Sequence, residues 1–393
     1  MRLFRGGTEI FFRFLRIAVS LAFCSALIST AGQAADGEPP PLVLGQSCAL
    51  SGPSKNLGQE MRAGLLAAFA WINDQGGVHG RRIRLISLDD SYEPDRAIQN
   101  TLRLLSEDKV FLVIGEVGTP TSQAVLPIIE EQGVPFFAPL TGAELLRTPD
   151  RYWVINVRAS YFQEMEGLTG YLVDHLGLTR IACFYQNDGY GFAGLEGIER
   201  ALARRGMDLV ARGSYERNTV AVMGALREID KAGPQAIVMA GAYGACAEFI
   251  KLHKAKGRNR PLYCNISFVG TESLHRALGG HGEDVIVSQV VPFPGNGEPP
   301  LLREYAAAME KYQRDAPLSF ITLEGYIAGR LFAAVASQVR GELTRDKFIS
   351  AMEETGRFDL GGLILTFGPG DRQGLDTVYL TGIHPSIHLL DAN

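Results

Sequence analysis

The chain of 393 residues lacks any apolar run after residue 34 that is long enough to cross a bilayer. It also lacks an excess of basic residues. The first 34 residues hold four Arg and one Glu, so 34 basic and 42 acidic residues follow, a formal charge of −8. A surface with this charge repels nucleic acid, so we expect neither DNA nor RNA as a partner.

Cysteine is scarce, with five in the chain, and no CxxC or Cys/His spacing indicates a metal site. Cys24 falls in the N-terminal segment and follows Phe23, whereas lipid attachment requires a small residue at that place. Cys183 and Cys264 lie in apolar runs typical of buried strands, where a free thiol acts as a small hydrophobic group. We therefore favour free thiols over disulfides for the four remaining cysteines, Cys48, Cys183, Cys246 and Cys264.

The common catalytic motifs are also missing: the sequence has no GxSxG elbow, no HExxH and no paired catalytic carboxylates. Gly189 to Gly194 matches the dinucleotide-binding pattern GxGxxG, but Tyr190 would crowd a pyrophosphate there. His384 and His388 flank Pro385, and no third metal ligand is evident beside them. We therefore expect no catalytic residues, no cofactor and no metal.

What the sequence does contain begins with the pattern of an export signal. Met1 to Arg16 is basic, Ile17 to Ile28 is apolar, and Gly32 and Ala34 place small residues where a signal peptidase reads them. The pattern predicts a cleavable signal peptide over residues 1–34 and a location in the periplasm. A retained membrane anchor is the alternative.

Beyond this segment, strand-like apolar runs alternate with amphipathic helices, which predicts an α/β fold with doubly wound parallel sheets. The 359 residues after position 34 exceed the size of one core, and the element order repeats, so we expect two similar lobes. The chain should cross between them near Val157, Val291 and Phe367. The predicted lobes are 42–156 plus 292–363 and 157–291 plus 364–393. Near the C-terminus, Gly361–Phe367 and Thr377–Leu380 are expected to form a β-hairpin.

Four loops follow strand ends and are rich in small or hydroxylated residues: Ser51–Ser54, Gly118–Thr121, Pro139–Gly142 and Asp188–Gly191. Ligands of open parallel sheets bind at this edge. Hydroxyl groups at a helix start can hold a carboxylate with help from the helix dipole. Helix capping explains any single loop equally well, but four loops at one edge favour binding. Tyr161, Tyr190 and Tyr243 also follow strand ends, where they would either stack on a ligand or wall a cleft.

A family resemblance begins at these loops. Ala49-Leu50-Ser51-Gly52, then Leu57-Gly58 and a helix ending in Ile72–Val78, resembles the periplasmic Leu/Ile/Val-binding-protein family of ABC importers. The likeness continues in order through Gly115–Ser122, Ala138-Pro139, Arg158, Tyr190-Gly191 and Phe268–Leu274. It implies a type I periplasmic-binding fold with three crossovers, no catalysis, and delivery of the bound solute to a membrane permease.

The resemblance also implies a ligand site. The family's carboxylate-binding hydroxyl falls on Thr119, its next backbone contact on Leu140, and a further hydroxyl near Thr141 or Gly142. Its stacking tyrosines fall on Tyr190 and near Tyr243. The family's acid for the ligand ammonium falls on Ser267, which is a departure, with Glu116 or Glu272 as substitutes. We add Ser51 and Tyr161 to the candidate residues from the loops described above.

These observations predict an exported, monomeric, two-lobed solute-binding protein that closes on its ligand and delivers it to an ABC permease in the inner membrane. The expected ligand is a small carboxylate, either an amino acid or a related acid that lacks the amine, aromatic acids included. One alternative is a ligand-sensing module of a signalling system. The other is an exported enzyme that uses the same cleft.

Overall fold

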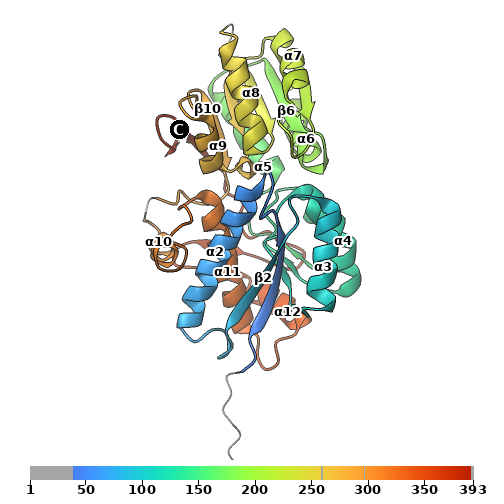
Figure 1. The fold of residues 1–393 in the computed structure, drawn as a ribbon, viewed down its shortest axis with the longest axis vertical. Helices are drawn as coiled ribbons and strands as arrows, with labels where there is room; N and C mark the ends of the chain where they lie inside the picture. Colours follow the sequence, from blue (N-terminus) through green and yellow to red (C-terminus); the bar gives the residue numbers. More distant parts are fainter. Residues whose placement is uncertain (1–38, 258–259, 296, 391–393) are drawn as a thin grey trace, which may run out of the picture. The chain divides into compact units, whose positions relative to one another are not determined.

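A computed structural model describes residues 39–257, 260–295 and 297–390. The predicted signal peptide, residues 1–34, lies outside the described residues. One compact unit, Pro41–Asn393, holds all the helices and strands described below (Figure 1).

The first sheet of this unit has the strand order β2-β1-β3-β4-β5. Every neighbouring pair is parallel, with Leu44 of β1 beside Leu85 of β2 and Ile114 of β3 beside Phe137 of β4. Strands β1, β3, β4 and β5 are almost entirely buried, as parallel strands covered on both faces must be, whereas most of the edge strand β2 is half-buried. Their bounds are β1 Leu42–Cys48, β2 Ile83–Asp89, β3 Val113–Ile114, β4 Phe136–Phe137 and β5 Val154–Ile155.

Helices cover this sheet on both faces, and we call the sheet with its helices the first lobe. Figure 1 shows α3 and α4 together on one side of the sheet, and α2 with α11 on the other. Segments 94–132 and 300–355 therefore pack on one sheet although they lie far apart in the sequence. The helices are α2 Lys55–Asp74, α3 Pro94–Ser106, α4 Thr119–Gln132, α10 Pro300–Tyr312, α11 Phe320–Gln338 and α12 Arg345–Thr355.

The helix α11 is long and apolar enough to cross a membrane, but 83% of its apolar window is buried inside the molecule. It crosses α2 at glycines. A Cβ atom at Gly64 would lie 2.0 Å from the Thr322 carbonyl oxygen, and one at Gly325 would lie 2.4 Å from the Met61 carbonyl oxygen. Backbones can approach this closely only without side chains, so α11 serves as a core helix of the first lobe.

The second sheet has the order β14-β13-β10-β9-β8-β6-β7 and, with its helices, forms the second lobe. Its central strands β10, β9, β8, β6 and β7 pair in parallel, whereas β13 and β14 run antiparallel at one edge. The strands are β6 Ile181–Gln186, β7 Ala211–Tyr215, β8 Ala236–Ala240, β9 Leu262–Asn265, β10 Val285–Gln289, β13 Tyr379–Gly382 and β14 His388–Leu389. The helices are α5 Tyr161–Thr169, continued as a π-helix to His175, α6 Gly189–Ala203, α7 Met223–Ala232, α8 Tyr243–Ala255 and α9 Thr271–Leu278.

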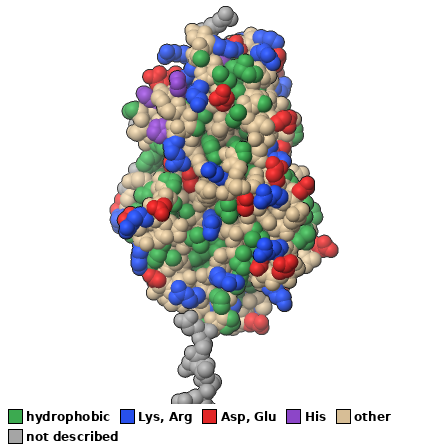
Figure 2. All heavy atoms as spheres, in the orientation of Figure 1, with side chains coloured by type: hydrophobic (Ala, Val, Ile, Leu, Met, Phe, Trp, Pro, Cys, Tyr) green, Lys and Arg blue, Asp and Glu red, His purple; other side chains and the backbone are tan. Residues whose placement is uncertain are grey.

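The chain passes between the two sheets three times: after β5, after β10 and before β13. Two parallel-sheet lobes joined by three crossings confirm the predicted fold class. The residues at which each lobe begins and ends, 42–156 plus 292–363 and 157–291 plus 364–393, stay a prediction. Figure 2 shows acidic and basic side chains interspersed over the visible face, a mixture that favours solubility.

The predicted C-terminal hairpin is wrong. Strand β12 (Ile364–Thr366) pairs antiparallel with β11 (Arg357–Asp359), and β13 pairs instead with β10 of the second sheet. The Asp359 carboxylate accepts hydrogen bonds from the N–H groups of Gly361 and Gly362, both at φ 90°, and so closes the turn between β11 and β12. Because that turn already gives β12 a partner, the buried segment around Leu380 is left to extend the second sheet.

The four cysteines after the N-terminal segment are free and buried, which confirms the prediction of free thiols. Burial raises the pKa of all four thiols, Cys48, Cys183, Cys246 and Cys264. Within the ranges that the structure describes, no group of three His, Cys, Asp or Glu side chains is placed to hold a metal ion.

Candidate functional site

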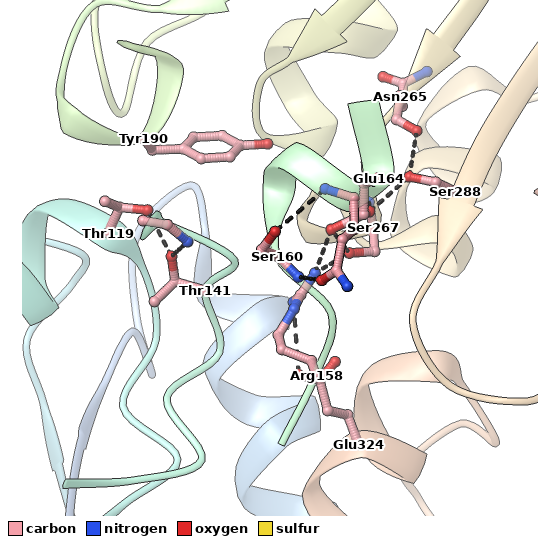
Figure 3. A network of polar contacts seen from close by, with 12 residues as sticks. Thr119, Thr141, Arg158, Ser160, Glu164, Tyr190, Asn265, Ser267, Ser288 and Glu324 are labelled. Atoms are coloured by element: carbon pink, nitrogen blue, oxygen red, sulfur yellow. Dashed lines mark hydrogen bonds and ion pairs between the residues drawn. The ribbon is translucent and has the colours of Figure 1, made fainter. Parts of the chain in front are cut away.

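The candidate site lies where the carboxyl ends of the first sheet meet the second lobe, and its floor is a pair of hydroxyls. Thr119 begins α4 after β3, and Thr141 follows β4. Their Oγ1 atoms lie 2.7 Å apart, and both side chains are fully buried. Gly118 allows this placement, because its φ is 106° and a Cβ there would lie 2.1 Å from the Tyr92 ring. The positive end of the α4 dipole therefore coincides with two hydroxyls (Figure 3).

Backbone hydrogen bonds hold the two hydroxyl-bearing loops together. The Leu140 N–H donates to the Glu116 carbonyl over 2.7 Å, and the Leu140 carbonyl accepts from the Gly118 N–H over 3.2 Å. The Gly142 carbonyl accepts from the Tyr161 N–H over 2.7 Å, and a Cβ at Gly142 would lie 2.5 Å from the Tyr161 ring. Glycine at this position thus lets Tyr161 pack against the loop that carries Thr141.

The roof of the site is aromatic. Tyr190, near the start of α6, is fully buried, and Figure 3 shows its ring facing Thr119 and Thr141 from the second lobe. Its ring centroid lies 4.6 Å from that of Phe268 and 5.5 Å from that of Tyr161. Tyr92 of the first lobe stands 6.0 Å from Phe268. The Asp188 carboxylate caps α6 by accepting from the Tyr190 N–H, which fixes where this ring enters the site.

The starts of α4 and α6 meet at this place. A Cβ at Gly189, the first residue of α6, would lie 2.8 Å from Gln123 Oε1 and 3.8 Å from Thr119 Cγ2. The N-termini of α4 and α6 therefore lie side by side next to the hydroxyl floor. Each carries about half a positive charge, so the surroundings of Thr119 favour an anion.

A buried ionic network lies beside the aromatic roof. Arg158 Nη2 donates to Glu164 Oε1 over 2.8 Å and also to the Ser267 hydroxyl, and Arg158 Nη1 lies 3.6 Å from Glu324 Oε1 (Figure 3). Burial alone would lower the pKa of Arg158, but Glu324 and Glu164 outweigh it and raise that pKa. Arg158 follows the first crossing of the chain. Because Glu164 belongs to α5 of the second lobe and Glu324 to α11 of the first, the network joins the two lobes at this crossing. We call Arg158, Glu164 and Glu324 the hinge anchor.

Ser267 occupies the position at which the resemblance places an acid. In this structure it hydrogen-bonds to the carboxylate of Glu164, which belongs to another segment of the chain. Its N–H donates to Glu164 Oε2 over 2.8 Å, and its hydroxyl donates to Glu164 Oε1 over 3.0 Å. The Ser288 hydroxyl donates to Glu164 Oε2 over 2.6 Å. The negative charge near this position therefore belongs to Glu164 of α5, which sequence reasoning missed.

Two of the predicted site residues lie away from the hydroxyl floor. Ser51 is exposed, and its hydroxyl lies 2.6 Å from Asp89 Oδ2 and 2.7 Å from the Ser91 hydroxyl. The Tyr243 hydroxyl donates to the Pro53 carbonyl of the first lobe. The structure thus brings Thr119, Leu140, Thr141, Gly142, Tyr161 and Tyr190 close together and places Ser51 and Tyr243 in contacts with other residues.

Two further acids are the predicted substitutes for the charge partner of a ligand. Glu116 is fully buried, neither of its carboxylate oxygens has a hydrogen-bond partner among the described residues, and burial followed by Asp90 raises its pKa well above the ordinary range. Glu272 accepts from the Phe320 N–H over 3.2 Å, and burial, followed by the nearby Glu60, raises its pKa to about 8. The Glu272 carboxyl is therefore mainly protonated at neutral pH, and burial favours the protonated form of Glu116 as well.

The raised pKa of Glu272 predicts how stability depends on pH. Its pKa in the folded protein, about 8, lies above the ordinary value of 4.5, so folding holds a proton that the unfolded chain releases. Its contribution is complete below pH 4.5 and is lost as the pH rises through 8. We expect the melting temperature to fall between pH 6.5 and pH 8. Glu272→Gln should flatten this decline, and a melting temperature that rises across the interval would contradict the assignment.

A second set of contacts joins the lobes at the rim, and we call it the rim clamp. Asn218 Nδ2 donates to Glu93 Oε1 over 2.7 Å and to the Ser91 carbonyl over 3.2 Å. Arg217 Nη2 donates to Glu93 Oε2 over 2.9 Å, and Arg217 Nη1 donates to Asp188 Oδ2 over 3.2 Å. Glu93 comes from the first lobe, whereas Arg217 and Asn218 come from the second. Sequence reasoning missed these residues, because none belongs to a motif.

The rim clamp should favour the closed arrangement without touching the ligand. Glu93→Ala removes it from the first lobe and should weaken every ligand by the same factor, about two- to fivefold, since partly exposed ion pairs contribute about 0.5–1 kcal/mol. Calorimetry on two ligands measures this. The control is Glu131→Ala, an exposed acid of α4. A loss of affinity that differs between ligands would show that Glu93 contacts them directly.

The fold and the site together define a class of protein: two-lobed binding proteins that hold a solute between parallel-sheet lobes. A family model described as "Periplasmic binding protein" matches residues 41–385 of the chain. The chain therefore belongs to the periplasmic binding protein family, which confirms the resemblance given by its loops. Members of this family bind solutes for ABC transporters and are not enzymes.

Relatives and solved structures agree with this assignment. "Leu/Ile/Val-binding protein homolog 7" of Brucella suis biovar 1 is 26% identical over 338 residues, which cover 82% of each chain. A solved structure of a possible leucine/isoleucine/valine-binding protein from Rhodopirellula baltica SH 1 is 37% identical, with a TM-score of 0.87, and covers 91% of this chain and 98% of that one. A substrate-binding periplasmic protein from Ralstonia solanacearum is 27% identical, with a TM-score of 0.82, and covers 89% and 100%.

Proposed function

We propose that this protein captures a small carboxylate-bearing ligand between its lobes and delivers it to an ABC permease in the inner membrane. The ligand is an amino acid or a related organic or aromatic acid. The observation that carries the proposal is the buried Thr119–Thr141 hydroxyl pair, which lies at the start of α4 and faces Tyr190 of the other lobe.

The hydroxyl pair suits a carboxylate for a simple reason. In the contact between Thr119 and Thr141 one hydroxyl donates to the other, so the second hydroxyl keeps its hydrogen for a ligand. Hydrogen bonds to an ionised acceptor are about twice as strong as neutral ones. The dipoles of α4 and α6 add to the attraction, because both helices begin here.

Capture requires both lobes. The floor residues Thr119 and Thr141 belong to the first lobe, whereas Tyr161, Tyr190 and Phe268 belong to the second. A ligand that contacts both sets binds the closed arrangement more tightly than an open one and therefore shifts the protein towards closure. The crossings of the chain between the lobes are the natural hinge.

The relatives support the same class of ligand. The Brucella suis protein is named for leucine, isoleucine and valine, and a Pseudomonas aeruginosa relative, 21% identical over 274 residues, is named an amino acid binding protein. Amino acids share their carboxylate with organic and aromatic acids that lack the amine. The Thr119–Thr141 pair is suited to this common group.

Pairs of acids and their amides test the proposal. Ligand-stripped protein is heated with 4-methylpentanoate and 4-methylpentanamide, L-leucine and L-leucinamide, and benzoate and benzamide. We expect any acid that binds to raise the melting temperature more than its amide does, and Tyr190→Ala to abolish the rise. Equal stabilisation by an acid and its amide would contradict a carboxylate site.

Export is a separate part of the proposal. We propose that residues 1–34 are removed and that the mature protein lies in the periplasm as a monomer. N-terminal sequencing of protein recovered from the periplasm should begin at Ala35. A sequence that begins at Met1, or a lipid on Cys24, would contradict this part and would leave the ligand site unaffected.

A further inference from the structure

A third set of contacts joins the lobes where α9 of the second lobe meets α2 and α11 of the first. Asn56 Nδ2 of α2 donates to the Ser273 hydroxyl of α9 over 3.0 Å. The Phe320 N–H of α11 donates to Glu272 Oε1 of α9 over 3.2 Å. The first turns of α9 are therefore held against the first lobe by polar contacts with two of its helices.

Two acids take part in this contact, one from each lobe. Glu60 of α2 is buried, and its carboxylate accepts from the Ser319 hydroxyl over 2.7 Å and from Arg276 Nη2 over 3.3 Å. Glu272 has much less support, because its Oε2 is buried without a hydrogen-bond partner among the described residues. We call Glu60, Glu272 and Arg276 the α9 latch.

The groups that face Glu272 do not balance a negative charge on it. On α9 itself, Arg276 pairs with Glu60 at 3.3 Å, and in the described part of the chain no cation forms an ion pair with Glu272. Facing it from α2 is Glu60, a second acid, and from α10 Tyr305, which burial keeps neutral by raising its pKa. From α11 comes the N–H of Phe320. Burial, followed by Glu60, accordingly raises the pKa of Glu272 to about 8.

Solvent reaches the edge of the α9 latch. A cavity of about 410 Å³ lies between α2, α9 and the segment 312–317, and both Glu60 and Arg276 line it. The side chain of Arg276 is 55% exposed. The latch can therefore exchange protons with the surrounding solution while the lobes remain in contact.

We propose that the α9 latch couples closure of the lobes to the uptake of one proton by the Glu60–Glu272 pair. In the closed arrangement two buried acids share one arginine, so one carboxyl keeps a proton. Opening moves α9 away from α2 and α11 and returns both carboxyls to water, where they ionise at neutral pH. The inference rests on the lobe closure of the proposed function and not on the class of ligand.

The direction of the pH effect follows from the pKa of Glu272, about 8 in the closed arrangement against an ordinary value of 4.5. Its contribution to closure is complete below pH 4.5 and is lost as the pH rises through 8. Between these values each pH unit should lower the ratio of closed to open molecules by up to about tenfold. A ligand that binds the closed arrangement takes up the same proton, so its affinity should fall with pH as well.

Single-molecule energy transfer in the ligand-free mature protein tests the inference without any ligand. Dyes on Gln132→Cys of α4 and Arg227→Cys of α7 report the distance between the lobes, since both positions are exposed and the four native cysteines are buried. We expect the ratio of closed to open molecules to fall about ten- to hundredfold from pH 6 to pH 8. The same distribution at both pH values, or a ratio that rises, overturns the inference.

Glu272→Gln separates proton uptake from packing, because the amide keeps the size of the carboxyl and its acceptor oxygen but cannot ionise. Its ratio should stay at the low-pH value up to pH 8. Glu60→Gln removes the neighbouring charge and frees Arg276, so the loss of closed molecules should begin at lower pH. The control Glu354→Gln, an exposed acid of α12, should match the wild type. A wild-type pH response in Glu272→Gln would show that another group carries the proton and overturn the latch.

The latch and the proposed function can fail separately. The acid and amide pairs judge the class of ligand, whereas the energy-transfer measurement needs no ligand. A ratio of closed to open molecules that ignores pH would reject the latch and leave the carboxylate site in place. Equal stabilisation by acids and amides would reject the carboxylate site and leave the latch in place.

Discussion

Replacing Arg158 with Met is expected to lower the free energy of unfolding by about 3–5 kcal/mol. The guanidinium is 1% exposed and lies between two buried acids, Glu164 at 2.8 Å and Glu324 at 3.6 Å. Met fills a similar volume but leaves both carboxylates without a counter-charge. The ordinary alternative, protonation of one acid, also costs free energy at neutral pH. Urea denaturation at pH 7 measures the loss.

A control variant and a rescue variant test whether the loss of stability comes from the buried charges around Arg158. Arg314→Met removes an exposed pair with Glu310 of α10, at 3.1 Å, and should change stability by less than about 0.5 kcal/mol. Adding Glu164→Gln and Glu324→Gln to Arg158→Met removes the two orphaned charges and should restore part of the loss. If Arg158→Met unfolds like the Arg314→Met control, these three residues do not anchor the hinge.

Replacing Thr119 with Val is expected to weaken ligand binding by about 1.5–3 kcal/mol, or roughly 10- to 150-fold, because one hydrogen bond to a charged group is lost. The change is nearly isosteric. Thr141 keeps its contact with the Ala143 N–H at 3.2 Å, so the loop should hold its shape. Calorimetry with the tightest-binding acid measures the effect.

Thr101→Val is the matched control for this substitution. Thr101 is also fully buried, lies on α3 of the same lobe, and its hydroxyl has no hydrogen-bond partner in the described chain. Its replacement should leave affinity unchanged and stability equal or slightly higher. If Thr119→Val and Thr101→Val bind the acid with equal affinity, the hydroxyl floor does not contact the ligand.

Much of the fold could be predicted from local pattern. Buried apolar runs separated by amphipathic helices specify parallel strands, so the alternation from Leu42 to Val291 indicated both sheets correctly. The hairpin near the C-terminus failed because its two strands are chosen by distant partners. Ile364–Thr366 pairs with β11 through a turn at Asp359, and Tyr379–Gly382 pairs with β10. The alternation of apolar and polar residues within a segment does not specify which strand it will pair with.

The site divides in the same way. The proximity of Thr119, Thr141 and Tyr190 was predictable because loops at the carboxyl ends of parallel strands converge on one edge, whereas their contact with a ligand stays a prediction. The position of the Glu164 carboxylate could not be predicted. It accepts hydrogen bonds from Ser267 and Ser288, residues more than a hundred positions further along the chain. The rim clamp was hidden for the same reason, because Glu93 and Asn218 become neighbours only when the two lobes meet.

If the protein captures its ligand as proposed, variants of the hinge anchor, the hydroxyl floor and the rim clamp should have different effects. Arg158 joins the lobes permanently through Glu164 and Glu324, so variants there should act on stability. Variants of Thr119 should change affinity and leave stability nearly unchanged. Glu93 acts on the balance between open and closed arrangements, and its effect should be independent of ligand identity. Measuring stability and affinity for each variant therefore separates the three roles.

The most direct test of the central claim is mass spectrometry of the small molecules that mild denaturation releases from the purified protein. The account predicts a carboxylic acid at about one molecule per chain, and much less of it from Thr119→Val. A neutral solute, or an amine without a carboxylate, recovered in equal amounts from the wild type and from Thr119→Val would contradict the carboxylate site itself.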